Sequence, residues 1–302
     1  MRNPMLEPSL KEVICPDAEG GHRMAYWQWG DPAGGHVLMC VHGLTRQGRD
    51  FDVLARAVCA QAGHPICVIC PDVVGRGRSD WLRHPGGYQI PHYAADILVL
   101  LAHLKPTTLD WLGTSMGGLI GMALAGQPEL PAHAQIRRLV LNDVGPVIEW
   151  QALQRIGQYL GQIPVFDNEQ QAGAALWAVA SSFGPHTEAQ WLELTRPCLK
   201  PLDDGSGRLT LRYDPALAVP FLAMTPESSA QGEALLWQAY DRITAQTLLV
   251  RGMDSDLLSV ATAQAMMQRG PKARLVEFAG VGHAPTFVAP EQVHAALSFL
   301  LT

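Results

Sequence analysis

The chain has 302 residues, of which 48% are hydrophobic and 17% charged, and its formal net charge is −6. This composition is typical of a soluble globular protein with a large core and excludes a disordered chain. Lys and Arg form no basic run, so we expect no binding to nucleic acid or to an anionic membrane. No apolar run approaches the ~20 residues of a membrane span. The residues Met1–Pro4 lack the apolar core of a secretory signal, which predicts a cytoplasmic protein.

The first half of the chain alternates short β-rich runs with helical patterns. The runs predict strands at 13–15, 22–29, 37–41, 66–70, 109–112 and 138–142, and helices at 51–62, at 93–104 and after residue 115. Near-continuous apolar runs are typical of strands that are covered on both faces. Alternation with helices therefore predicts a largely parallel sheet between two helical layers. The run 22–29 alternates only partly and ends at Gly30-Asp31-Pro32, which favours an antiparallel hairpin at the sheet edge.

The pattern changes after residue 145. Helical segments follow at 150–160, 168–183, 188–194 and 229–240, and strands return at 247–251 and 275–278 before a last helix at 290–301. We therefore predict a core domain formed by residues 1–145 and 244–302. Residues 146–243 form a helical cap, which we expect to act as a lid over the active site.

A sharp turn with a serine at its apex is the strongest local signal. The sequence Gly113-Thr114-Ser115-Met116-Gly117 lies between an apolar strand and a helical pattern. Such a turn exposes the serine hydroxyl, and glycine at the two flanking positions removes a collision. The first N–H groups of the following helix suit a negatively charged oxygen. We predict that Ser115 is a nucleophile.

A serine needs a base, and the base needs a carboxylate partner. His283 follows a strand through a glycine-rich loop near the C-terminus, and we predict that it is the base. Asp256 is our preferred acid, because the apolar Leu257-Leu258 after it can anchor its loop. Asp254 and Asp143 stay open as alternatives, the latter also as a hinge residue or hydrogen-bond anchor.

The tetrahedral intermediate needs N–H donors for its negative oxygen. We predict the N–H of Met116 and the N–H of Leu44, which lies in the loop after the strand 37–41. His42 in the same loop is interpreted as structural. Arg46 either meets an acidic substrate or is an ordinary solvated arginine.

Six cysteines, at positions 15, 40, 59, 67, 70 and 198, raise the question of a metal site. Cys67 and Cys70 are three residues apart on a predicted strand, so they point to opposite faces and cannot hold one ion. We expect buried small hydrophobes and no metal. The other histidines are interpreted as surface or incidental residues; they are residues 22, 36, 64, 84, 92, 103, 133, 186 and 294.

These segments together resemble the α/β-hydrolase superfamily. The resemblance rests on His42-Gly43, the turn Asp72-Val73-Val74-Gly75-Arg76-Gly77-Arg78-Ser79, the serine turn, Gly252 to Asp256, and Gly282-His283, in this order. It covers essentially the whole chain. It implies a mostly parallel eight-stranded sheet with a helical cap inserted after the sixth strand, and a structural role for the turn 72–79. Many relatives carry the acid where Ser255 stands here, and some carry it after the sixth strand, where Asp143 stands.

The predicted activity is that of a serine hydrolase without cofactor, which cleaves small carboxylic esters or lactones through an acyl-enzyme. Four tryptophans in the cap, Trp150, Trp177, Trp191 and Trp237, either line the acyl pocket or form the core of the cap. One alternative is a carbon–carbon bond hydrolase of ring-cleavage products, which uses a similar triad. Another is a non-catalytic small-molecule receptor or scaffold.

Overall fold

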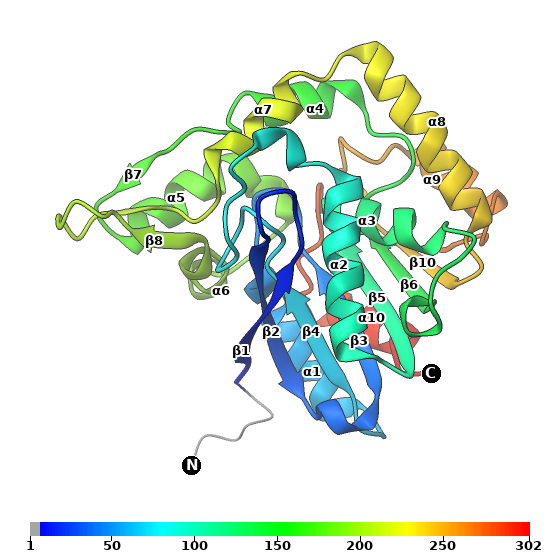
Figure 1. The fold of residues 1–302 in the computed structure, drawn as a ribbon. Coiled ribbons are helices and arrows are strands. Elements are labelled where there is room, and N and C mark those ends of the chain that lie inside the picture. The colour runs from blue at the N-terminus through cyan, green and yellow to red at the C-terminus, as the bar shows by residue number, and fades with distance from the viewer. Residues whose placement is uncertain (1–6) are drawn as a thin grey trace.

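The computed structural model describes residues 7–302 and contains one large sheet of eight strands with helices on both sides (Figure 1). The strands lie in the order β1-β2-β4-β3-β5-β6-β10-β11. β1 pairs antiparallel with β2 and β2 antiparallel with β4, and the other neighbours are parallel. The strands are Ser9–Cys15 (β1), His22–Gly30 (β2), His36–Val41 (β3), Cys67–Pro71 (β4), Thr108–Thr114 (β5), Ile136–Asn142 (β6), Gln246–Gly252 (β10) and Arg274–Phe278 (β11).

The middle strands are buried on both faces, as their apolar runs predict. On β4, Cys67 and Ile69 belong to one hydrophobic cluster, whereas Val68 and Cys70 belong to the cluster on the other face. The predicted opposite orientation of the two cysteines is confirmed. All six cysteines are buried and free.

Each face of the sheet is covered by its own helices (Figure 1). α1 (Asp52–Gln61) and α10 (Pro290–Leu300) pack on one face through side chains such as Leu54 and Leu297. α2 (Ile90–Leu104) and α3 (Met116–Ala125) pack on the other face through side chains such as Ile97 and Ile120. A further helix, α9 (Val260–Gln268), was not predicted.

The predicted edge hairpin is confirmed, since β1 and β2 pair antiparallel from Ser9↔Gln28 to Cys15↔His22. β1 begins at Ser9, four residues before the predicted start at residue 13. The prediction missed these residues because they are exposed and carry no apolar pattern. An edge strand with one solvated face carries fewer apolar residues than a central strand.

Residues 146–243 leave the sheet after β6 and return to it at β10; this segment is called the insertion below. Its helices are α4 (Trp150–Gly157), α5 (Glu169–Ala180), α6 (Glu188–Thr195), α7 (Ala218–Leu222) and α8 (Pro226–Arg242). The fold is thus the expected one, with an insertion after the sixth strand. Whether the insertion acts as a separate lid domain stays a prediction.

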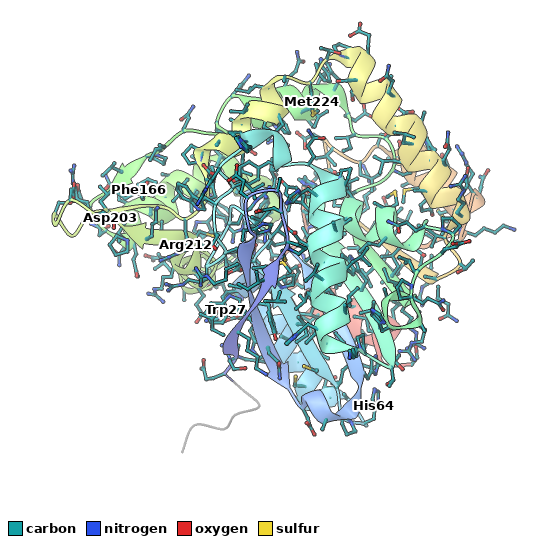
Figure 2. The ribbon with its side chains drawn as sticks, viewed as in Figure 1. Trp27, His64, Phe166, Asp203, Arg212 and Met224 are labelled. Atoms are coloured by element: carbon teal, nitrogen blue, oxygen red, sulfur yellow. The ribbon has the colours of Figure 1, made fainter. Side chains whose placement is uncertain are left out.

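The insertion also contains a small antiparallel sheet that the sequence analysis missed. Its strands are β7 (Val165–Phe166), β8 (Leu199–Pro201) and β9 (Leu209–Leu211), in the order β7-β9-β8. Strands of two or three residues are too short to show an alternating pattern. In Figure 2, Phe166 marks this sheet, and Asp203 marks the tip of the loop between β8 and β9.

The turn 72–79 joins the insertion to the core. The Gly77 N–H donates to the Arg212 carbonyl at 3.1 Å, and the Asp214 N–H donates to the Gly75 carbonyl at 2.8 Å. The buried Asp72 carboxylate accepts from the Arg78 N–H inside the turn and from the Gly48 N–H outside it. Burial raises the pKa of Asp72 to about 6. The turn is therefore structural, as the resemblance implies.

Two histidines interpreted as incidental are in fact buried in polar networks. His22 lies between Asp17 and Asp96, at 3.0 Å from each carboxylate. Burial lowers the pKa of His22, but the two hydrogen-bonded carboxylates outweigh it and raise the pKa above its usual value. His36 contacts the buried Asp110 carboxylate at 2.8 Å. These contacts join β2 to α2 and β3 to β5, so the interpretation was wrong for these two residues.

Within residues 7–302, no helix combines the length and the hydrophobicity that crossing a bilayer would require.

The tight packing of the serine turn leads to a stability prediction. A Cβ at Gly117 would lie 2.0 Å from the Val41 carbonyl oxygen, so Gly117→Ala should lower the free energy of unfolding by about 3 kcal/mol or more. Urea unfolding measures this change. Gly232→Ala in the middle of α8 is the matched control, since a Cβ there meets nothing within 4 Å. We expect it to stabilise by about 0.5–1 kcal/mol. A similar effect of both substitutions would contradict the packing argument.

Candidate active site

Ser115 lies at the turn between β5 and α3 in a backbone conformation that few residues adopt. Its φ is 51° and its ψ is −116°. A Cβ at Gly113 would lie 2.2 Å from the Gly117 carbonyl oxygen, so the predicted need for glycine at both flanking positions is borne out by the packing. The turn lifts the Ser115 side chain above the carboxyl edge of the sheet.

His283 lies between Ser115 and Asp143. The Nε2 atom of His283 is 2.9 Å from the Ser115 Oγ, and its Nδ1 atom is 2.7 Å from the Asp143 Oδ2. Since a carboxylate only accepts, Nδ1 carries the proton and Nε2 faces the serine with its lone pair. The histidine side chain is 12% exposed and the aspartate side chain is 0% exposed.

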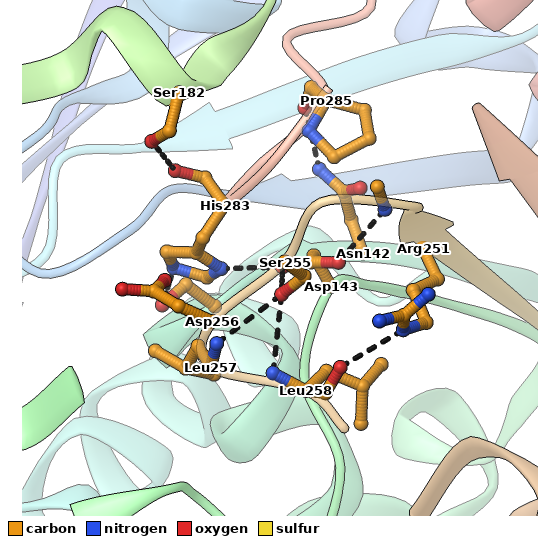
Figure 3. A network of polar contacts seen from close by, with 12 residues as sticks. Asn142, Asp143, Ser182, Arg251, Ser255, Asp256, Leu257, Leu258, His283 and Pro285 are labelled. Carbon is orange, nitrogen blue, oxygen red and sulfur yellow. Dashed lines mark hydrogen bonds and ion pairs between the residues drawn. The ribbon is translucent and has the colours of Figure 1, made fainter. Parts of the chain in front are cut away.

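Asp143 directly follows β6 and accepts two more hydrogen bonds (Figure 3). The Gly252 N–H donates to its Oδ1 at 2.9 Å, and the Ser255 hydroxyl donates to its Oδ2 at 2.6 Å. Its φ of 54° is in the left-handed region, which aspartate tolerates better than most residues. Three donors thus compensate the burial of the carboxylate and fix its direction.

The preferred acid Asp256 does not reach His283, so this prediction is wrong in the structure. Its carboxylate pairs with Arg155 instead, and no contact joins it to the histidine in Figure 3. Ser255 faces inward toward Asp143, and its neighbours Asp254 and Asp256 are both exposed. The alternative Asp143 occupies the position that we expected for Asp256.

The two predicted N–H donors lie beside the serine. Neither the Met116 N–H nor the Leu44 N–H has an acceptor among the described residues. The Gly43 carbonyl belongs to the same peptide as the Leu44 N–H, and it accepts from the His42 Nδ1 at 2.7 Å and from the Arg46 N–H at 3.2 Å. Because C=O and N–H point in opposite directions in a trans peptide, these bonds turn the Leu44 N–H away from His42.

Arg76, a residue that the sequence analysis did not single out, holds this arrangement together. Its guanidinium is fully buried and donates to the Leu44 carbonyl at 2.8 Å and to the Val74 carbonyl at 2.7 Å. It also lies 3.3 Å from the Met116 Sδ. One buried cation therefore fixes both segments that carry the free N–H groups. The sequence signal that could have identified Arg76 is its position within the turn 72–79.

A cavity of about 130 Å³ opens above Ser115 and His283 between the core and the insertion. The insertion lines it mainly with apolar side chains, namely Ile156, Leu176, Val179, Phe183 and Leu194. None of the four tryptophans lines the cavity, so of the two alternatives the lining of the acyl pocket was wrong. Trp191 is buried within the insertion, where its ring packs edge-to-face against Trp177 and its N–H donates to the Gly173 carbonyl.

Arg46 lines the cavity but is already paired. Its Nε and Nη2 donate to Asp50 at 2.7 Å, and Nη2 also donates to the Leu194 carbonyl at 2.9 Å. Asp50 lines the same cavity, so this part of the wall carries a neutral ion pair. Arg46 is therefore neither a solvated arginine nor a free cation.

The described residues bring together one further group with metal-binding side chains, Cys15, His22 and Asp96. None of them lines the cavity. Both ring nitrogens of His22 are hydrogen-bonded to carboxylates, which explains the cluster as an internal ion-pair network. The site itself holds one histidine and one buried carboxylate, fewer ligands than a closed metal site needs.

The groups of the site are arranged for nucleophilic substitution at a carbonyl. A serine hydroxyl contacts a histidine base, the base contacts a buried carboxylate, and two free N–H groups lie beside the serine. Such a set of groups is typical of enzymes that form an acyl intermediate.

Comparison with known proteins identifies the class. The model of the alpha/beta hydrolase family matches residues 38–296, and the chain belongs to this family. It is therefore a hydrolase. It is 49% identical to a 3-hydroxybutyrate-oligomer hydrolase of Cupriavidus necator over 97% of each chain.

Two further matches agree with this assignment. The chain is 31% identical to a 3-oxoadipate enol-lactonase of Acinetobacter baylyi over 36% of this chain and 39% of that protein. Among solved structures, an alpha/beta hydrolase from Novosphingobium aromaticivorans is 34% identical with a TM-score of 0.81, covering 98% of this chain and 99% of that chain.

The support that His42 gives to the Leu44 peptide has a pH dependence. Burial lowers the pKa of His42 to about 3. The unfolded chain takes up a proton at this residue below about pH 6.5, whereas the folded chain does not. The stability that neutral His42 provides is therefore complete above about pH 6.5. It falls by about 1.4 kcal/mol per pH unit as the pH drops toward 3.

His42→Gln should remove this slope, and urea unfolding at about pH 7 and about pH 5 measures it. The control is His103→Gln, which changes an exposed histidine of α2. We expect the wild type and His103→Gln to lose more stability between the two pH values than His42→Gln. An equal loss in all three proteins would contradict a neutral buried His42.

Proposed function

We propose that this protein is a serine esterase that hydrolyses short esters of hydroxyacids, with linear 3-hydroxybutyrate oligomers as the substrate class. The continuous contact Ser115–His283–Asp143, with distances of 2.9 and 2.7 Å, carries the proposal for the mechanism. The 49% identity over nearly the full length to an oligomer hydrolase supports the substrate class.

The proposed reaction has two halves. In the first, His283 Nε2 takes the hydroxyl proton while Ser115 Oγ attacks the ester carbonyl carbon. The same proton then passes to the leaving alcohol, and an acyl-enzyme remains. In the second half, His283 takes a proton from water, the hydroxide attacks the acyl carbon, and Ser115 regains its proton as the acid product leaves.

Charge develops at two places in this reaction, and this chain has groups at both. The carbonyl oxygen becomes negative, and the Leu44 and Met116 N–H groups would donate to it. The imidazole becomes positive, and Asp143 would stabilise it and hold its orientation. The bonds from Gly252 and Ser255 keep that carboxylate aligned without a conformational search.

The size of the cavity favours a short acyl group. Its volume of about 130 Å³ is smaller than the ~300–1,000 Å³ of typical small-molecule sites. Apolar side chains of the insertion line it, and we propose that the insertion acts as the cap that selects the acyl group. A four-carbon hydroxyacyl unit fits this description better than a long fatty acyl chain.

Substitution of the three residues tests the mechanism. We expect Ser115→Ala to lower kcat for p-nitrophenyl butyrate by about 10⁴-fold or more, and Asp143→Asn by about 10³–10⁴-fold, because the amide favours the wrong tautomer of His283. Asp254→Asn is the matched control, since this exposed carboxylate has no contact with the histidine. It should retain the wild-type kcat. Circular dichroism confirms that each variant is folded. A fully active Asp143→Asn would overturn the assignment of the acid.

A series of substrates tests the acyl preference and the alternative reaction. Turnover should be highest for p-nitrophenyl esters of about four carbons and should fall for acyl chains of about twelve, because the cavity cannot enclose them. A vinylogous 1,5-diketone, the substrate type of carbon–carbon bond hydrolases, should react much more slowly than the short esters. A rate that rises steadily with chain length, or faster cleavage of the diketone, would argue against the proposal.

A further inference from the structure

The insertion contributes two polar side chains to the cavity wall, beside its apolar ones. Arg155 lies in α4, and Tyr159 follows four residues later, in the turn after the helix. Both line the cavity together with Ile156. The hydroxyl of Tyr159 can donate a hydrogen bond to a ligand in the cavity.

The guanidinium of Arg155 is held along one edge only. Its Nε and Nη2 donate to the two oxygens of Asp256 at 2.8 and 3.0 Å. Asp256 is not among the residues that line the cavity. A guanidinium has five N–H donors in a planar fork, so the edge formed by Nη1 and Nη2 remains for a second carboxylate. No other carboxylate within residues 7–302 forms an ion pair with Arg155.

Arg46, the other arginine in the wall, differs in this respect. Its partner Asp50 lines the cavity and cancels its charge there, and its side chain is only 14% exposed. Arg155 is 38% exposed, and its partner approaches from outside the cavity. The cavity therefore contains one positively charged group whose counter-charge lies outside it.

We propose that Arg155, oriented by Asp256 and assisted by Tyr159, forms a subsite for the free carboxylate of the substrate. This inference rests on the function proposed above. In a linear hydroxyacid oligomer, the one free carboxylate lies at the end of the leaving-alcohol side. Binding of that carboxylate places the adjacent ester bond at Ser115. In the dimer, the acyl group is then a single four-carbon unit, and the products are two molecules of the hydroxyacid.

The proposal also gives Asp256 a role as a positioning residue. An exposed ion pair contributes little to stability, so the contact with Asp256 is not needed to keep α4 in place. Bidentate binding does, however, fix the plane of a guanidinium. The loop after β10 thus orients both the triad acid, through Ser255, and the proposed carboxylate subsite, through Asp256.

A matched pair of substrates tests the subsite. The first is the linear dimer of 3-hydroxybutyrate with a free carboxylate, and the second is the same dimer with a terminal primary amide. The two share the scissile ester and nearly the same shape, and they differ in charge. We expect the wild type to prefer the free acid by about 10–100-fold in kcat/KM, the range of a hydrogen bond to a charged group.

Arg155→Gln should abolish this preference. It should lower kcat/KM for the free acid by about 10–100-fold, mainly through KM, and leave the amide nearly unaffected. Arg208→Gln is the matched control, because Arg208 is also an exposed arginine of the insertion paired with an aspartate, Asp204. Arg208→Gln should leave kcat/KM unchanged for both the free acid and the amide. Hydrolysis of p-nitrophenyl butyrate measures the integrity of the triad in each variant.

The outcomes separate the subsite from the proposed function. Equal hydrolysis of both dimers by the wild type, or an equal loss for both in Arg155→Gln, would overturn the subsite and leave the esterase intact. Hydrolysis of p-nitrophenyl butyrate but of neither dimer would overturn the substrate class together with the subsite. No hydrolysis of any ester would overturn the proposed function itself.

Discussion

The close approach of α3 to the backbone of β3 is the contact on which the site depends. A Cβ at Gly117 would overlap the Val41 carbonyl, and one at Gly113 would overlap the Gly117 carbonyl. Without side chains at these positions, the turn at Ser115 comes next to the loop that follows β3. That loop carries the Leu44 N–H, and the first residue of α3 carries the Met116 N–H. The same contact therefore sets the direction of the serine and the separation of the two N–H groups.

The structure explains why the serine turn and the histidine were predictable and the acid was not. The determinants of the turn lie within residues 113–117, so local sequence describes them fully. The acid depends on two neighbouring strands, β6 and β10, which both end at the edge of the sheet where His283 lies. The loop after each of these strands contains an aspartate, and both aspartates come after Ser115 and before His283 in the chain. Chain order therefore allows either one as the acid. The choice follows from the inward direction of Ser255 and the left-handed backbone of Asp143, and neither is visible in a local pattern.

The structure of the insertion could also be predicted only in part from the sequence. Four of its five helices were predicted from their periodicity, whereas α7, the short strands and the identity of the cavity-lining residues were not. Large indole rings pack best where their N–H finds an acceptor, as Trp191 does inside the insertion. Branched and smaller residues such as Ile156 and Leu176 then line the cavity. Composition identified the tryptophans of this segment but not which of them would be buried inside it.

The residues proposed for the reaction and those proposed for substrate selection are fixed by contacts of different kinds. The triad acid is buried, and three donors from separate elements fix it, so removing any one leaves a buried group without its partner. The pair of Arg155 with Asp256 is exposed and can change at little cost to the fold. A fold of this design keeps the reacting groups constant while surface contacts of the insertion vary with the substrate. Asp256 belongs to the second kind of contact, although it lies next to Ser255, which belongs to the first.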